Sequence, residues 1–272
     1  MNSQIRTIIT DIKAAARIGH PESLWAALEG LLNLPQTLGN PPMTPAFIEK
    51  AILPVGEALA SPRLNLALIQ PLSDEPQAVL RASAAAALAF RYLNQDQITI
   101  KQLNKPAADS RQDVRLALQF GLSKTDDPLK IEPLIEQWLP ASSPRLQALA
   151  ISLLPHQPGQ ALARLAAQKI NSDPDVRAAL VGTLIALAQA GQAEDVLTLL
   201  AKWAADQDNH IWTICKTLAG SWAAKFPEQA LDILSALIPQ ADNPKQIINT
   251  LQALHRHGAG EEVISTLKAW QQ

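Results

Sequence analysis

The sequence predicts an all-α protein, an α-solenoid of about six to seven stacked pairs of antiparallel helices. The first observation is composition: hydrophobic residues make up 47% of the 272 residues and aromatic residues only 4%. Most of the hydrophobic residues are Ala and Leu, which favour helices, and few are of the kinds that fill strands. The second observation is a helical segment that recurs along the chain. The third is a second series of amphipathic segments that alternates with the first.

The recurring segment is clearest at residues 172–188, SDPDVRAALVGTLIALA, where Asp173 and Pro174 suit the first turn of a helix. Related segments lie at 76–90, 110–122 and 142–154, and looser copies begin at 208 and 242. The first hydrophobic residues of the six copies are spaced by 34, 32, 30, 35 and 36 residues: Leu80, Val114, Leu146, Val176, Ile211 and Ile247. A period of this length is typical of repeats made of two helices.

The second series supplies the other helix of each pair. Its segments cover 128–139, 158–170, 193–205, 227–238 and 261–270. Each segment has a hydrophobic stripe that it cannot bury alone, so we expect successive pairs to stack on one another. We therefore predict an N-terminal helical cap, 1–60, and a repeat region, 61–272, which together form one continuous domain, 1–272.

The N-terminal cap is predicted to contain three helices, at 3–18, 21–33 and 44–60. The second and third are joined by a Pro- and Gly-rich segment, LPQTLGNPPMTP at 34–45, which has the composition of a loop. We interpret this segment as a spacer between helix pairs. The alternative is a binding loop, because loops often carry binding residues.

The repeat region resembles the HEAT-repeat family, which has an armadillo-type fold. The resemblance is carried by the Asp and Pro residues at the helix starts and by Leu-Arg or Val-Arg pairs at 80–81, 114–115 and 176–177. It extends over about residues 62–272, with Gln147 and Trp212 standing where the repeat would place Arg. The resemblance implies a right-handed solenoid with an extended concave face, and it specifies the fold far better than the function.

Charge and cysteine content restrict the classes of partner and the compartment. The formal net charge is −2 and the pI is about 6.2, so the basic excess that holds a polyanion is absent and nucleic acid is a disfavoured partner. The one cysteine, Cys215, allows no disulfide within the chain and fits a reducing compartment. Residues 1–20 lack the hydrophobic core of a signal peptide, and we expect a cytoplasmic protein without membrane segments.

The sequence contains no pattern that predicts catalysis, a metal or a cofactor. It has no Gly-rich phosphate loop, no nucleophile elbow and no Cys-x-x-Cys pair. The histidines are scattered, and His255 and His257 would point about 200° apart on a helix. We therefore expect no catalytic residue, no metal ligand and no cofactor, although carboxylates from distant repeats could still converge.

Three arginines, Arg81, Arg115 and Arg177, occupy the same position in three repeats. In HEAT repeats such arginines resemble a structural ladder that pairs with acidic residues of adjacent repeats. The available partners are Asp113, Asp173 and Asp175. The alternative is an anion-binding stripe along the inner helices, which would make these arginines binding residues.

The stretch DNHIWTICKTLAGSWAAKFPEQAL, 208–231, is predicted to form one helix. Helical spacing places six residues on one buried stripe: Ile211, Ile214, Cys215, Leu218, Trp222 and Phe226. Trp212 lies to the side of this stripe, with Lys216 one turn further on. We therefore select Trp212 and Lys216 as binding residues at the edge of the concave face, and interpret Trp138 and Trp203 as packing residues.

The leading functional hypothesis is a non-catalytic scaffold that binds another protein or peptide on its concave face. The alternative is a DNA repair enzyme, because residues 203–231 resemble the C-terminal repeats of the HEAT-like alkylpurine DNA glycosylases. The residues that carry this similarity are Trp203, Asp206, Asp208, Trp212 and Trp222. No catalytic Asp is matched. A positive groove with an acidic residue facing two exposed aromatic residues would favour the enzyme, and an apolar or mixed groove would favour a protein partner.

Overall fold

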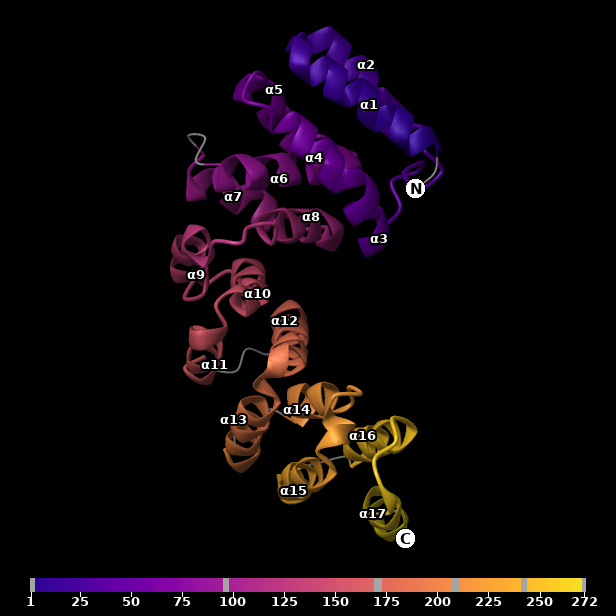
Figure 1. Ribbon diagram of the computed structural model, residues 1–272, viewed down its shortest axis with the longest axis vertical. Coiled ribbons are helices and arrows are strands. Elements are labelled where there is room, and N and C mark those ends of the chain that lie inside the picture. Colours follow the sequence, from indigo (N-terminus) through magenta and orange to yellow (C-terminus); the bar gives the residue numbers. More distant parts are fainter. Residues whose placement is uncertain (1–2, 95–97, 169–172, 207–210, 241–243, 271–272) are drawn as a thin grey trace. The chain divides into compact units, whose positions relative to one another are not determined.

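A computed structural model gives the arrangement of the chain (Figure 1). It describes residues 3–94, 98–168, 173–206, 211–240 and 244–270, except for the side chains of residues 240, 262, 267, 268 and 270. Within these ranges all regular structure is helical and no strand occurs, as the sequence predicts. The chain forms two compact units, Met1–Leu149 and Ala150–Gln272, which are described separately as unit 1 and unit 2.

The helices of unit 1 form two alternating series. The first series packs in chain order and comprises α1 (Ser3–Ile18), α4 (Leu53–Leu59), α6 (Ala78–Leu93) and α8 (Gln112–Leu122). The second series lies between them in the chain and comprises α2 (Pro21–Leu32), α5 (Leu66–Ile69), α7 (Ile100–Ala107) and α9 (Glu132–Trp138). The short helix α3 (Pro45–Phe47) continues through the π-helical turn Ile48–Ile52 into α4. Helix α10 (Pro144–Leu153) contains the boundary between the units.

Unit 2 has the same alternation. Its first series is α12 (Pro174–Leu187), α14 (Ile211–Leu218) and α16 (Lys245–Arg256), each packed against the next. Its second series is α11 (Pro158–Ala166), α13 (Ala193–Ala205), α15 (Pro227–Leu237) and α17 (Glu261–Trp270), again in contact in chain order. Helices that follow each other in the chain, such as α12 and α13 or α16 and α17, also pack together, so each unit is built of two helical layers.

Small residues allow the helices of unit 1 to approach closely. Every residue of α6 from Ala82 to Ala89 is buried. A Cβ atom added at Gly56 of α4 would lie 2.4 Å from the Cβ of Ala86, and one added at Gly121 of α8 would lie 2.7 Å from the Cβ of Ala89. The alanine run of α6 is therefore the surface on which α4 and α8 pack, and its small side chains are required by that packing.

The prediction of one helix over 208–231 is wrong. Helix α14 ends at Leu218, a turn follows, and α15 begins only at Pro227. In the turn the Trp222 ring folds back over Gly220, and its Nε1 donates a hydrogen bond to the Thr217 carbonyl oxygen at 3.2 Å. Trp222 is nevertheless buried, as is Cys215, so their assignment to the core is confirmed.

Helices α5 and α7, which the recurring segments of the sequence do not cover, complete the second series of unit 1. Helix α7 begins with a capping box formed by Thr99 and Gln102, which is a sequence signal for a helix start. It also contains Pro106. Because proline ordinarily ends a helix, the sequence around Pro106 does not predict one.

The Pro- and Gly-rich segment 34–45 is a loop, and it is attached to the starts of α6 and α8. Asn40, in a left-handed conformation with φ 57°, accepts a hydrogen bond from the Ala78 N–H at 2.9 Å. Arg111 donates to the carbonyl oxygens of Asn40 and Pro41, at 3.1 and 2.9 Å. These contacts fit the interpretation of the segment as a spacer between helix pairs.

One helical run of the described residues, Pro174–Ala205, is long and apolar enough to cross a membrane by length and composition alone. The run is interrupted at Gly191, which has φ 101° and separates α12 from α13. The two halves belong to different layers and pack against each other. The structure is therefore compatible with a soluble protein.

Candidate binding groove

A cavity of about 500 Å³ lies between α14 and α16 of unit 2, and we call it the α14–α16 groove. Helix α14 and the residue that follows it line the groove with Trp212, Cys215, Lys216 and Ala219, and α16 lines it with Gln246, Asn249, Thr250, Gln252, Ala253 and Arg256. On α14, Cys215 and Lys216 follow Trp212 by three and four positions, so they share one face of the helix. The sequence-predicted residues Trp212 and Lys216 therefore lie in one groove, together with an unpredicted row of polar residues on α16.

The floor of the groove consists of small, buried side chains. Cys215, Thr250 and Ala253 are buried, at 3%, 3% and 7% exposure. The Thr250 hydroxyl has the carbonyl oxygens of Cys215 and Gln246 as acceptors within reach, at 3.2 and 2.9 Å, and the contact with Cys215 joins α16 to α14. The rim consists of exposed polar residues: Lys216, Gln246, Asn249, Gln252 and Arg256.

Trp212 is half-buried and has a cation on its ring. The Arg177 Cζ atom, from α12, lies 5.2 Å from the Trp212 ring centroid, a cation–π contact. The Nε atom of Arg177 is buried and has no hydrogen-bond partner within the described part of the chain. Three predicted binding residues, Arg177, Trp212 and Lys216, are therefore brought together in unit 2, with Arg177 supporting the ring that lines the groove.

The charge of the groove differs in sign from that of the unit around it. Among the described residues that line the groove, two are cations, Lys216 and Arg256, three are amides and none is a carboxylate. Residues 150–272 as a whole carry nine Lys and Arg against eleven Asp and Glu, a formal net charge of −2. The groove is therefore a local positive site on an acidic unit.

The other two predicted binding residues, Arg81 and Arg115, belong to unit 1 and make hydrogen bonds within it. Arg81 pairs with Asp109 at 2.8 Å and donates to the carbonyl oxygens of Glu75 and Pro76, at 2.8 and 2.9 Å. Arg115 donates to the carbonyl oxygens at the same offsets, those of Asp109 and Ser110, at 2.8 and 3.3 Å. Both arginines thus hold the start of their own helix. For Arg177 these offsets fall on residues 171 and 172, outside the described residues.

The acidic partners differ from those expected. Asp109, not Asp113, pairs with Arg81, and Asp113 instead pairs with Arg111 at 2.7 Å. Asp113 also accepts a hydrogen bond from the Met43 N–H of the spacer loop, at 2.9 Å. Asp173 caps its own helix by accepting from the Asp175 N–H at 2.8 Å. Because a side chain at the start of a helix finds the unpaired N–H groups of that helix close by, capping competes with pairing to a neighbouring repeat.

The Cys215 thiol in the groove floor is a packing group. Burial raises its pKa to about 11 and outweighs the opposing effects of the hydrogen bond with Thr250 and the charge of Lys216. The thiolate, which is the nucleophilic form, is therefore scarce near neutral pH.

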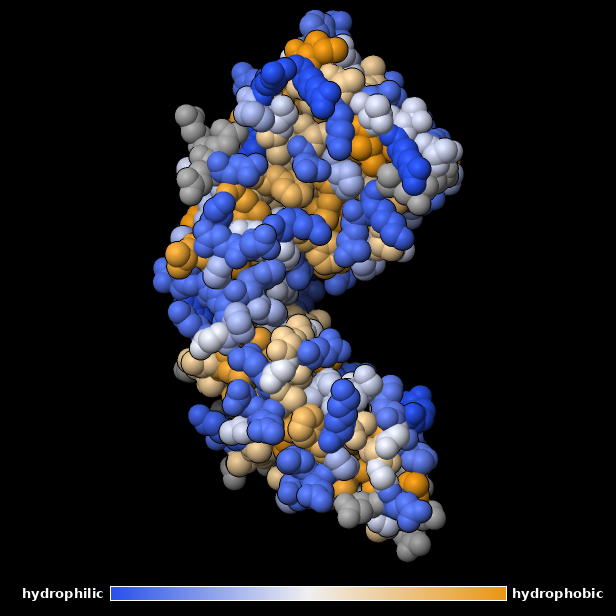
Figure 2. Space-filling model, viewed as in Figure 1, coloured by the Kyte–Doolittle hydropathy of each residue, from blue (hydrophilic) through white to orange (hydrophobic). Residues whose placement is uncertain are grey.

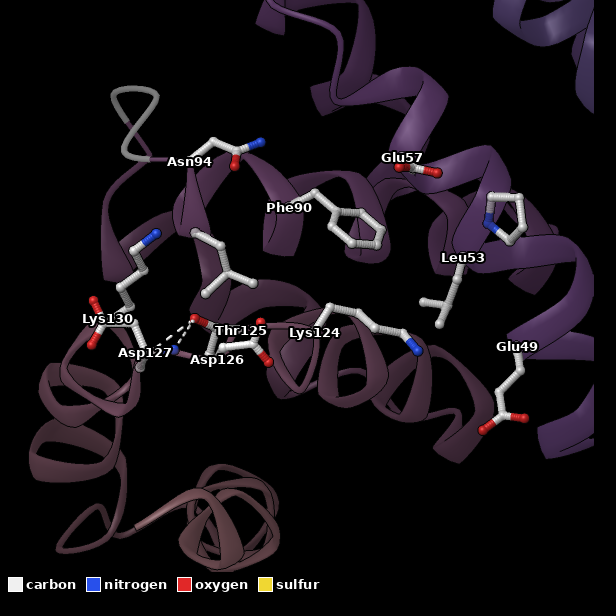
Figure 3. Close-up of a pocket in the computed structure, with 12 residues that line it drawn as sticks. Glu49, Leu53, Glu57, Phe90, Asn94, Lys124, Thr125, Asp126, Asp127 and Lys130 are labelled. Atoms are coloured by element: carbon white, nitrogen blue, oxygen red, sulfur yellow. Dashed lines mark hydrogen bonds between the residues drawn. The ribbon is translucent and has the colours of Figure 1, made fainter.

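A second pocket, of about 700 Å³, lies in unit 1 where the ends of α6 and α8 approach α4 and the start of α9 (Figure 3). Phe90 and Leu53 form part of its apolar wall, and its rim mixes Glu49 and Glu57 with Lys124 and Lys130. Figure 3 shows Lys124 extending toward the side formed by Leu53 and Glu49. With Asp126 and Asp127, the described lining carries four carboxylates against the two lysines. On the face shown in Figure 2, small hydrophobic patches are likewise interspersed with hydrophilic residues.

The other tryptophans are mostly in the core. Trp138 and Trp203 are buried, at 0% and 4% exposure, which confirms that they are packing residues. Trp222 is 5% exposed, whereas Trp25 of α2 is 37% exposed. The side chain of Trp270 lies outside the described residues.

Within the described part of the chain, no three His, Cys, Asp or Glu side chains form a group that could hold a metal ion. Asp206 is exposed at the end of α13 and does not line the groove, and Asp208 lies outside the described residues. Comparisons of the chain with models of known protein families, with curated proteins and with solved structures found no match.

Proposed function

We propose that the chain is a non-catalytic scaffold with the right-handed solenoid architecture of HEAT repeats, which binds another protein through the α14–α16 groove. The alternating layers of α12, α14, α16 and α13, α15, α17 support this architecture. The groove takes the role of the concave binding face that the family resemblance implied. We place the protein in the reducing cytoplasm, where a buried thiol such as Cys215 stays reduced.

The observation that carries the proposal is the composition of the groove. A half-buried aromatic side chain, Trp212, stands beside exposed cations and amides; the described lining contains no carboxylate or histidine, and burial raises the pKa of its one thiol, Cys215. Aromatic and Arg side chains are the residues that most often dominate binding energy at protein interfaces. Such a lining recognises a partner without transforming it.

The DNA repair alternative meets one of its two conditions. The described lining of the groove is positive, but it contains no carboxylate, and Trp203 and Trp222, which would present further aromatic faces, are buried. A base taken out of a duplex needs stacking surfaces and a catalytic group, and of these the described lining offers Trp212. Binding of a protein is therefore the function that the groove supports best.

The test is selection of peptides from a displayed random library by the purified chain. The wild-type chain is expected to enrich a set of peptides, and Trp212→Ala is expected to lose at least about tenfold in affinity for them, because an interface hot spot contributes roughly 2 kcal/mol or more. The melting temperature should fall by no more than about 4 °C, since Trp212 is not a core residue.

Trp25→Ala is the matched control, because Trp25 is an exposed tryptophan on α2, in the other unit. It should bind the selected peptides as the wild type does. Failure to enrich any peptide, or equal binding by Trp212→Ala, would refute the proposed function. Turnover of a substrate that is lost in a groove variant would show that the chain is an enzyme.

A further inference from the structure

We propose that the α14–α16 groove receives a short, extended segment of a partner that is rich in Asp and Glu. This inference rests on the proposed function and specifies its ligand. It depends on three properties of the groove: the sign of its charge, the distribution of its amides and the size of its floor residues.

The charge selects an acidic segment. Lys216 projects from α14 and Arg256 from α16, both are exposed, and none of the described residues lining the groove is a carboxylate. A segment with carboxylates would meet cations from both helices, whereas a basic segment would meet like charges and no counter-ion. Arg256 can also bind a carboxylate through two parallel hydrogen bonds, which Lys216 cannot.

The amides select an extended main chain. Gln246, Asn249 and Gln252 are exposed and stand three positions apart on α16, so they form one row along the groove. Each amide has both a donor and an acceptor, which matches the alternating N–H and C=O groups of an extended peptide. The row of amides therefore presents hydrogen-bond donors and acceptors to a peptide as the edge of a strand does, but through side chains and not through the main chain.

The floor leaves room for a backbone. Cys215, Ala219, Thr250 and Ala253 are small, and the Thr250 hydroxyl already has the Cys215 and Gln246 carbonyl oxygens as acceptors. From Gln246 to Arg256 the helix rises about 15 Å, at 1.5 Å per residue. An extended chain advances about 3.3 Å per residue, so roughly four or five residues of the partner fit beside α16.

Trp212 lines the groove from α14, across from the amide row of α16, and Arg177 positions the Trp212 ring. The guanidinium of Arg177 covers one face of the indole at 5.2 Å. The contact leaves the rest of the ring to pack against an apolar side chain within the acidic segment. Arg177 therefore acts through Trp212, as a positioning residue.

A short acidic peptide fits this site better than a nucleic acid. Double-stranded DNA carries one negative charge per about 1.7 Å of its axis and is held by many phosphate contacts. The described groove lining has two cations, and the unit as a whole carries a formal net charge of −2, so the unit offers no basic excess to the phosphates beyond the groove. A ligand whose negative charge is confined to a few residues needs no such excess.

The experiment compares the composition of peptides selected by three proteins. The wild type is expected to enrich Asp and Glu over the unselected library. The double variant Lys216→Gln/Arg256→Gln should bind the same peptides about tenfold more weakly, because each exposed ion pair contributes up to about 1 kcal/mol. The reversed variant Lys216→Glu/Arg256→Glu should instead select peptides rich in Lys and Arg.

The matched control is Lys202→Glu, an exposed lysine of α13 that does not line the groove, and it should select as the wild type does. Thermal melts verify that every variant is folded, and the exposure of Lys216 and Arg256 allows both substitutions. A role of these two residues in stability alone would change the melts and leave the composition of the selected peptides the same.

The outcomes separate this inference from the function on which it rests. If no peptide is enriched, the proposed function fails. If peptides are enriched without Asp or Glu, or if charge reversal leaves the selection unchanged, the scaffold stands and the acidic ligand is refuted. Fluorescently labelled duplex and single-stranded oligonucleotides are titrated at two salt concentrations in parallel. Tighter binding of either than of the peptides, lost in Lys216→Gln/Arg256→Gln, would overturn the proposal in favour of a nucleic acid.

Discussion

The two units place different residues at the same position of the repeat. In unit 1, Arg81 and Arg115 both donate to the carbonyl oxygens five and six residues before them, and Arg81 also pairs with Asp109. In unit 2 this position holds Trp212 in one helix, and Arg177 of the preceding helix of that layer lies over its ring. The comparison teaches that arginines at one repeat position can have different neighbours: Arg81 and Arg115 reach carbonyl oxygens at the start of their own helix, whereas the contact described for Arg177 is with an aromatic ring.

The units also differ in how closely their helices pack. Gly56 and Gly121 bring α4 and α8 against the alanines of α6 in unit 1. In unit 2 the groove between α14 and α16 is kept open by a floor of small residues and a rim of long, exposed ones. Helices α4, α6 and α8 of unit 1 are thus closely packed, whereas unit 2 holds the α14–α16 groove, the proposed binding site. The predictions below test this contrast, from the largest expected effect to none.

The largest effect is expected for Asp113→Ala. Its carboxylate is 4% exposed and holds both Arg111 and the Met43 N–H, so the substitution removes the counter-ion of Arg111 and the acceptor of a buried N–H. We expect a loss of about 3 kcal/mol in the free energy of unfolding, measured by urea denaturation. The control Asp126→Ala removes an exposed carboxylate and should cost less than about 0.5 kcal/mol. Equal losses in the two variants would mean that the loop attachment is not a stabilising feature.

Close packing in unit 1 is tested by Gly56→Ala. The added Cβ would lie 2.4 Å from the Cβ of Ala86 and 3.0 Å from its backbone carbon, so α4 and α6 must separate. We expect a loss of about 2 kcal/mol by urea denaturation. In Gly182→Ala of α12 the added Cβ meets no atom within 4 Å, and the helix should gain up to about 1 kcal/mol. If Gly56→Ala and Gly182→Ala both lowered the free energy of unfolding, the difference in packing between these two glycine positions would be contradicted.

The arginine comparison is tested by Arg81→Ala and Arg177→Ala. Arg81→Ala leaves Asp109, which is 13% exposed, without its ion pair and should cost about 2 kcal/mol. Arg177→Ala removes a cation–π contact and should cost about 1 kcal/mol. Arg177→Ala should also weaken groove-selected peptides, whereas Arg81→Ala should bind them normally. If Arg177→Ala lost more stability than Arg81→Ala, and only Arg81→Ala weakened peptide binding, the structural arginine would be Arg177 and not Arg81.

Stability in acid provides a further test of Asp113. Burial alone would raise the pKa of this carboxyl, but the hydrogen bond from Arg111, the Met43 N–H and the positive charge of Arg111 together hold it below its ordinary value. A lowered pKa stabilises the folded chain above the unfolded pKa, about 3.9 for Asp, and that stabilisation is lost as the pH falls through the folded pKa. Asp113→Asn should therefore flatten the decline of stability below about pH 4. If stability declined with pH in Asp113→Asn as steeply as in the wild type, the lowered pKa of Asp113 would be contradicted.

No effect is expected from thiol reagents on the folded chain. Because burial raises the pKa of Cys215 to about 11, the native protein at neutral pH should react with an aromatic disulfide far more slowly than the chain in urea. Absorbance of the released thiol measures both rates. Rapid labelling of the native protein would show that the groove floor opens.

Much of the fold could be predicted from local patterns. Helix α13 covers the predicted segment 193–205, since its hydrophobic stripe is regular and Gly191 separates it from α12. The prediction failed where a tertiary contact redirects the chain, as at Trp222, whose ring folds back on Gly220 after α14 has ended. Pro106 concealed α7 in a similar way, because its backbone effect depends on its place in the helix.

Only the α14 half of the candidate site could be predicted from the sequence. Trp212 and Lys216 were found because Trp212 departs from the arginine of the repeat. The amides and Arg256 on α16 have no such signal, since an exposed polar row on a helix is the common state of a solvated face. One indication was available: Gln246, Asn249 and Gln252 recur every three residues and end at a cation, Arg256.

The sequence by itself determined the helical repeat, the hydrophobic stripes and the buried position of Cys215, because these depend on periodicity within a few turns of helix. Only the tertiary structure decided that Arg81 pairs with Asp109, that Asp113 holds the spacer loop and that α16 completes the groove of Trp212. The reason is physical: residues about 30 to 70 positions apart make these contacts, and which of several acceptors a side chain reaches depends on how the helices pack.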